Sequence, residues 1–73
     1  MDEFIDLRGL KCPMPALLAK RALLRAPRGT AIEIVCDDPL AALDVPHMCH
    51  HEKFEIVSVN RDGDRTRLVL RRP

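Results

Sequence analysis

The chain of 73 residues contains no tryptophan or tyrosine, and its aromatic side chains are limited to Phe4 and Phe54. Proteins bind single-stranded nucleic acids largely by stacking bases on aromatic rings, so this composition offers little material for such a surface. The 12 Lys and Arg against 11 Asp and Glu give a formal charge of +1, far from the basic excess of a dedicated nucleic-acid binder. We therefore expect no direct nucleic-acid binding.

Long apolar runs are also missing. No stretch approaches the roughly 20 residues of a membrane-spanning helix, and the acidic start, residues 1–4, lacks the basic and apolar parts of a secretory signal. Three cysteines are too few for the dense, even set of an oxidised secreted domain of this size. The sequence therefore predicts a cytoplasmic protein with reduced thiols and no membrane association.

Segments rich in β-branched residues alternate with segments rich in helix formers along the whole chain. This pattern is typical of one domain over residues 1–73. Proline near the start of each helical segment marks its beginning. We expect Asp62-Gly63 to supply the positive φ angles of a tight hairpin, and Pro46 to kink or split the second helix. The predicted strands are residues 4–7, 31–36, 54–59 and 66–70, and the predicted helices are residues 13–25 and about 40–49.

The order βαβαββ predicts an α/β two-layer sandwich. A right-handed crossover joins the first two strands and a hairpin joins the last two, which gives a mixed four-stranded sheet with two helices on one face. Asp38 is expected to cap the second helix through its carboxylate, while Pro39 fills a first-turn position. In the last strand Arg65, Arg67 and Arg71 should share the water-facing side.

Cys12 lies between the first strand and the first helix, directly before Pro13. A helix N-terminus carries partial positive charge and favours a thiolate over a thiol. Lys11 and Arg8 should add positive charge, whereas Asp6 should face elsewhere. The position predicts a nucleophilic cysteine, and the alternative is an ordinary small residue at a helix cap.

The segment Leu7–Pro15 resembles the signature of the TusA-like (SirA-like) sulfur carriers, which is Arg-Gly-Leu, one further residue and then Cys-Pro-x-Pro. The resemblance extends through Asp37-Asp38-Pro39, Asp44-Val45-Pro46 and Cys49, although Lys53-Phe54 stands where relatives commonly have a histidine. The motif residues of this chain are Gly9, Pro13, Pro15, Asp38 and Pro39.

The resemblance implies that Cys12 is a carrier thiol. It would accept sulfur as a persulfide from a cysteine desulfurase or rhodanese-like donor and pass it to an acceptor protein. The sulfur would serve tRNA thiolation, molybdenum-cofactor sulfuration or sulfur oxidation. Such a chain acts as a sulfurtransferase through its persulfide rather than as a multiple-turnover enzyme, and we expect it to be a monomer without a cofactor.

The first helix has a core-facing arc and an opposite arc that is basic and partly apolar. The second arc is either a solvated face or a surface that docks an acidic partner beside the cysteine. The candidate partner-binding residues are Arg8, Lys11, Met14, Leu17, Lys20 and Arg21.

Other thiols and imidazoles favour simpler interpretations. His47, Cys49, His50 and His51 are too closely spaced on one helix to form a defined zinc site, so no metal is expected. Cys36 and Cys49 are expected to pack in the core. No second cysteine lies at a C-x-x-C spacing from Cys12, which disfavours a thioredoxin-type oxidoreductase. A thiol-redox regulator, in which Cys12 forms a disulfide with another cysteine, is an alternative. The layout also resembles the C-terminal domain of a translation initiation factor, so a nucleic-acid-binding module is a further alternative.

Overall fold

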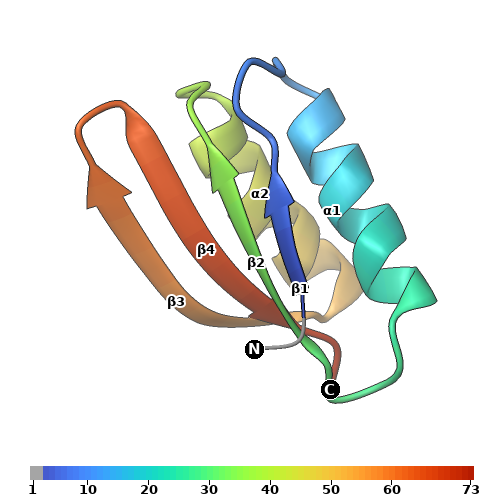
Figure 1. The fold of residues 1–73 in the computed structure, drawn as a ribbon. Helices are drawn as coiled ribbons and strands as arrows, with labels where there is room; N and C mark the ends of the chain where they lie inside the picture. The colour runs from blue at the N-terminus through green and yellow to red at the C-terminus, as the bar shows by residue number, and fades with distance from the viewer. Residues whose placement is uncertain (1–2) are drawn as a thin grey trace.

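The computed structural model describes residues 3–73; Met1 and Asp2, which belong to the acidic start considered above, lie outside the described residues. The elements are β1 (Glu3–Asp6), α1 (Met14–Arg25), β2 (Ala31–Cys36), α2 (Ala41–Glu52), β3 (Glu55–Asp62) and β4 (Arg65–Arg71). The strand order is β1-β2-β4-β3, with β1 and β2 parallel and the other pairs antiparallel (Figure 1). The predicted mixed sheet is confirmed.

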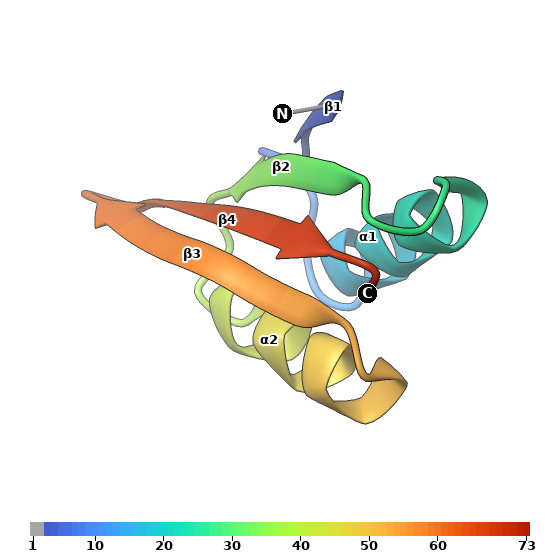
Figure 2. The same cartoon turned by 90° about the horizontal axis from the view of Figure 1, so that it is seen from below.

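Both helices lie on the same side of the sheet, as Figure 2 shows, which confirms the two-layer sandwich. The core forms where alternate residues of the central strands β2 and β4 meet the inner faces of the helices. Cys36 and Cys49 are fully buried in it, as expected. The core residues are Leu7, Ala19, Leu23, Ile32, Ile34, Cys36, Ala41, Val45, Cys49, Leu68 and Leu70.

The other side of the sheet is open, and the arginines predicted for it are exposed. Arg67 donates to Glu33 on β2 at 2.7 Å, and Arg71 is paired with Glu55 on β3. Because these cations face carboxylates from neighbouring strands, the surface carries mixed charge rather than a basic patch. Within residues 3–73 no helix is long and apolar enough to cross a membrane.

The second helix is not split at Pro46. It runs continuously from Ala41 to Glu52, beyond the predicted end. A proline removes one helical N–H, but Val45 and Cys49, on either side of Pro46 in the chain, are both buried in the same core. This packing holds the helix together through the proline. The helix ends at Lys53, whose φ of 64° is left-handed.

The hairpin between β3 and β4 differs from the prediction by one residue. Asp62 and Arg65 are paired, so the two-residue loop is Gly63-Asp64. Gly63 has a φ of 63°, whereas Asp62 has no positive φ. A type II′ turn requires glycine only at its first central position, so one glycine suffices.

Candidate functional site

Two loops meet at one edge of the sheet. Residues 7–13 follow β1 and residues 37–40 follow β2, and Figure 1 shows both connections at the same end of the molecule. The reason is topological, because the carboxyl ends of adjacent parallel strands lie at the same edge. Cys12 comes from the first loop, and Asp37 and Asp38 come from the second.

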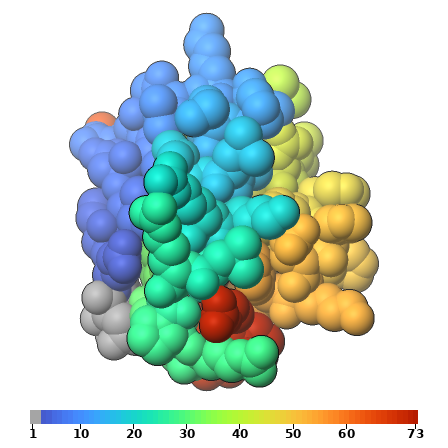
Figure 3. Space-filling model, turned by 90° about the vertical axis from the view of Figure 1, so that its right-hand side faces the viewer, coloured from blue at the N-terminus to red at the C-terminus, as the bar shows by residue number. Residues whose placement is uncertain are grey.

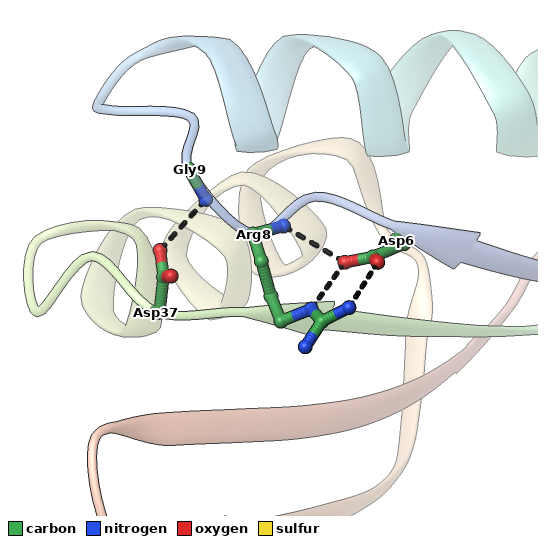
Figure 4. Close-up of polar contacts among 4 residues, drawn as sticks. All are labelled: Asp6, Arg8, Gly9 and Asp37. Carbon is green, nitrogen blue, oxygen red and sulfur yellow. Dashed lines mark hydrogen bonds and ion pairs between the residues drawn. The ribbon is translucent and has the colours of Figure 1, made fainter.

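Aspartate side chains of the second loop hold the backbone of the first. Asp38 Oδ2 accepts the N–H of Cys12 at 2.8 Å, and Asp37 Oδ1 accepts the N–H of Gly9 at 3.0 Å (Figure 4). Gly9 has a φ of 83°, a conformation that favours glycine. Each carboxylate therefore fixes the path of the loop that carries the cysteine.

The expected capping of the second helix is wrong in detail. Leu40 is the N-cap of α2 and makes no side-chain cap hydrogen bond. Asp38 Oδ1 instead accepts the N–H of Leu40 at 3.1 Å, and Pro39 lies in the turn before the helix rather than in its first turn. Since its other oxygen binds Cys12, Asp38 bridges the two loops instead of capping a helix.

Arg8, which was predicted to add positive charge near the cysteine, is held by Asp6. Its guanidinium donates to Asp6 through Nε at 2.9 Å and Nη2 at 2.7 Å, and its backbone N–H donates to the same carboxylate at 3.1 Å (Figure 4). The side-chain hydrogen bond from Arg8 is the main reason that the pKa of Asp6 falls to about 2. Asp6 therefore neutralises the cation that was expected to support a thiolate.

The thiol of Cys12 is half-buried and donates a hydrogen bond to Asp44 Oδ2 on α2. Pro13, not Cys12, is the N-cap of α1, so the cysteine lies one residue before the cap position at which it was expected. The hydrogen bond to Asp44 raises the pKa of the Cys12 thiol, and partial burial and the negative charges of Asp44 and Asp38 act in the same direction. The expected lowering of this pKa is therefore wrong, because carboxylates surround the sulfur.

Asp44 is the site residue that the sequence reasoning missed. It lies 32 positions from Cys12, so no local spacing relates the two. The available signal was its position in the first turn of α2, directly before the buried Val45. A polar residue beside a buried one in the first turn of a helix lies at the margin of the core. The loop after β1 reaches the same margin, where Cys12 bonds to Asp44.

A groove of about 440 Å³ runs between α1 and α2 and has Asp44 in its wall. Figure 3 views the molecule from the side of α1, with α2 beside it. Two predicted partner-binding residues, Leu17 and Lys20, contribute to the groove, and Lys20 is paired with Glu52 at 3.2 Å. The lining residues are Pro13, Ala16, Leu17, Lys20, Asp44, His47, Met48, His51 and Glu52.

The remaining candidates lie on α1 and on the loop before it. Met14 and Leu17, both on α1, expose 43% and 54% of their surface. Arg21 and Lys11 are also exposed, whereas Pro15, in the first turn of α1, is buried. The structure thus brings apolar and basic side chains together beside the cysteine.

The histidines of α2 and Phe54 are the last residues that the sequence singled out. In the part of the chain that the structure describes, no three His, Cys, Asp or Glu side chains are grouped closely enough to hold a metal ion. His47 and His51 line the groove instead. Phe54, which stands in the place of the usual histidine, packs against the core.

Comparison with known proteins agrees with this geometry. Residues 3–72 match the family described as sulfurtransferase TusA. The chain belongs to the TusA family. This membership supports a role as a sulfur carrier or sulfurtransferase that works with the partners of a sulfur relay.

A solved structure shares the TusA-family fold seen here. The SirA-like protein from Desulfitobacterium hafniense superposes with a TM-score of 0.81 at 20% sequence identity, over 94% of this chain and 95% of that chain. At this identity the likeness establishes the fold, and the assignment of individual residues depends on the site itself.

Proposed function

We propose that this TusA-family chain carries sulfur as a persulfide on Cys12. The observation that carries the proposal is the contrast among its three cysteines. Cys36 and Cys49 have no accessible surface, and burial raises the pKa of Cys49 to about 11. Cys12 is partly exposed beside a groove, so it is the thiol that a partner protein can reach.

The transfer needs no group beyond the two thiols that exchange sulfur. Cys12 Sγ attacks the terminal sulfur of a persulfide on the donor protein, the new S–S bond forms, and the donor S–S bond breaks. The departing electron pair remains on the donor cysteine, which takes the proton that Cys12 gives up. A cysteine desulfurase or a rhodanese-like protein is the donor class, and an acceptor protein receives the sulfur by the same exchange.

The docking surface for both partners is the exposed strip of α1 next to the cysteine. Exposed Met14 and Leu17 supply apolar contact area and Arg21 supplies positive charge, a combination that suits a partner with an acidic rim. Lys20 would add its charge when a partner carboxylate replaces Glu52, with which it is paired. Exposed Lys11 extends the positive charge to the loop, while Arg8 contributes less because Asp6 holds it.

The first test is direct sulfur labelling. The protein is incubated with a cysteine desulfurase and cysteine, and intact mass is measured with and without reductant. We expect one reducible added sulfur atom on the wild type and on Cys49→Ala, and none on Cys12→Ser. Equal labelling of Cys12→Ser and the wild type would refute the assignment.

The same preparation tests the thiol-redox alternative. Disulfide formation within this chain would require Cys36 or Cys49 to leave the core. Mild oxidation followed by thiol counting should therefore leave both buried thiols free. The paired loss of two thiols in the wild type, absent in Cys12→Ser, would favour a redox regulator.

The sulfur pathway is identified by a separate transfer experiment. Sulfur-labelled protein is offered to acceptor proteins from tRNA thiolation, molybdenum-cofactor sulfuration and sulfur oxidation, and the acceptor that gains the sulfur identifies the pathway.

A further inference from the structure

The sulfur of Cys12 lies among acidic groups rather than basic ones. Asp44 on α2 accepts the thiol hydrogen bond, and Asp38 on the loop after β2 accepts the backbone N–H of the same residue. The cations near the site are held elsewhere or face solvent. Arg8 is paired with Asp6, Lys20 is paired with Glu52, and Lys11 is exposed to solvent. Asp37 is bonded to Gly9, and His47 lies in the groove wall.

Such a setting treats the empty and the loaded carrier differently. A thiol has one proton to donate, and Asp44 accepts it, so the empty carrier satisfies both groups. A persulfide is more acidic than a thiol and ionises at neutral pH. Its terminal sulfur then has no proton to donate and bears a negative charge close to two carboxylates, and like charges destabilise one another.

We propose that Asp44 is a positioning residue that holds Cys12 of the empty carrier in its thiol form and destabilises the persulfide anion of the loaded carrier. The empty carrier is thereby shielded from adventitious electrophiles, and the loaded carrier is driven to give its sulfur away. Asp44 acts on the reacting sulfur through hydrogen bonding and charge, without forming a bond to it. The statement about the loaded carrier rests on the proposed persulfide function, whereas the statement about the thiol does not.

The thiol statement is tested by alkylating Cys12 with iodoacetamide over a range of pH and reading the rate by intact mass. Asp44→Asn removes the charge but keeps the shape, and it should move the midpoint of the pH–rate profile down by about one unit. A thiolate of lower pKa is a weaker nucleophile, with a Brønsted slope of about 0.5. The rate at neutral pH should therefore rise by only about threefold.

Two variants control this measurement. Asp44→Glu retains the charge and should keep the high midpoint of the wild type. Glu55→Gln removes a charge from β3, where the carboxylate is paired with Arg71 on the open face of the sheet, and it should also leave the midpoint unchanged. Urea unfolding of each variant verifies that the fold is intact. A wild-type midpoint in folded Asp44→Asn would overturn the role of Asp44 towards the thiol.

The loaded state is tested by exchange with glutathione, in which the carrier persulfide and the glutathione thiol give the carrier thiol and glutathione persulfide. Atoms and charge balance without an oxidant. Asp44→Asn should retain sulfur, with an equilibrium constant for release about tenfold below that of the wild type. Equal release from both proteins would overturn this half of the inference.

The outcomes separate the inference from the proposed function. If wild-type Cys12 takes up no sulfur, the proposed function fails and the statement about the loaded carrier fails with it, while the alkylation profile still decides whether Asp44 holds the thiol. If Cys12 takes up sulfur but Asp44→Asn matches the wild type in both assays, the function stands and the role of Asp44 is refuted.

Discussion

The two connections that lead from a parallel strand into a helix differ in what they contribute to the site. The connection after β1, residues 7–13, supplies the thiol and the backbone N–H groups of Gly9 and Cys12. The connection after β2, residues 37–40, supplies the two carboxylates that accept those N–H groups. Besides the hydrogen bonds within each loop, the two loops are tied to each other, with N–H donors on the first and carboxylate acceptors on the second. The cysteine is positioned by a partnership across the sheet edge.

Replacing Asp38 should disturb this partnership most. Its carboxylate accepts two backbone N–H groups, those of Cys12 and Leu40, and each such bond contributes about 1 kcal/mol. Asp38→Ala should therefore lower the free energy of unfolding by about 2 kcal/mol, measured by urea denaturation with an unchanged m-value. Asp38→Asn keeps one acceptor oxygen and should lose about half as much. Equal losses in the two variants would contradict the bridging role.

Replacing Asp37 should have a smaller effect. This carboxylate accepts one N–H, that of Gly9, in an exposed position. Asp37→Ala should cost about 1 kcal/mol or less in the same denaturation experiment. Because Gly9 is three residues before the cysteine, the sulfur labelling of Cys12 should remain at the wild-type level. A loss as large as that of Asp38→Ala would show that the two carboxylates share the work equally.

Replacing Asp6, the partner of Arg8, should have the smallest effect, and that effect should disappear in acid. The pKa of folded Asp6 is about 2, below its ordinary 3.8, so the pair stabilises the fold above about pH 4 and this contribution disappears as the pH falls through about 2. The stability difference between the wild type and Asp6→Asn, measured by urea denaturation, should shrink over that interval. A constant difference from neutral pH down to about pH 2 would show that the carboxylate acts other than through its charge.

The sequence predicts the fold well because the fold depends on local patterns. Runs of β-branched residues predict the strands, and prolines mark where the helices begin. The order of these elements then restricts the topology. The boundaries shift where tertiary packing outweighs a local rule. Pro46 should have broken α2, but the buried Val45 and Cys49 keep the helix whole.

The candidate site is less predictable because its electrostatics come from contacts between distant residues. Cys12 could be singled out from its own neighbourhood, yet the group that controls its proton, Asp44, is on another element. Charge counting along the chain also misplaced Arg8, since it could not show that Asp6, two residues earlier, holds the guanidinium. The partial charge of a helix terminus was therefore a poor guide to the state of the thiol.

The strand β3 has a further consequence for how the molecule behaves at high concentration. It is an edge strand of eight residues that exposes Val57 and Val59, and regular edges of this kind act as templates for another chain to add on. The register shift between Ile56 and Ser58 interrupts its ladder. A bulge bends and twists an edge strand, so the irregularity makes the first part of this edge a poorer template for a second copy than a straight strand would be.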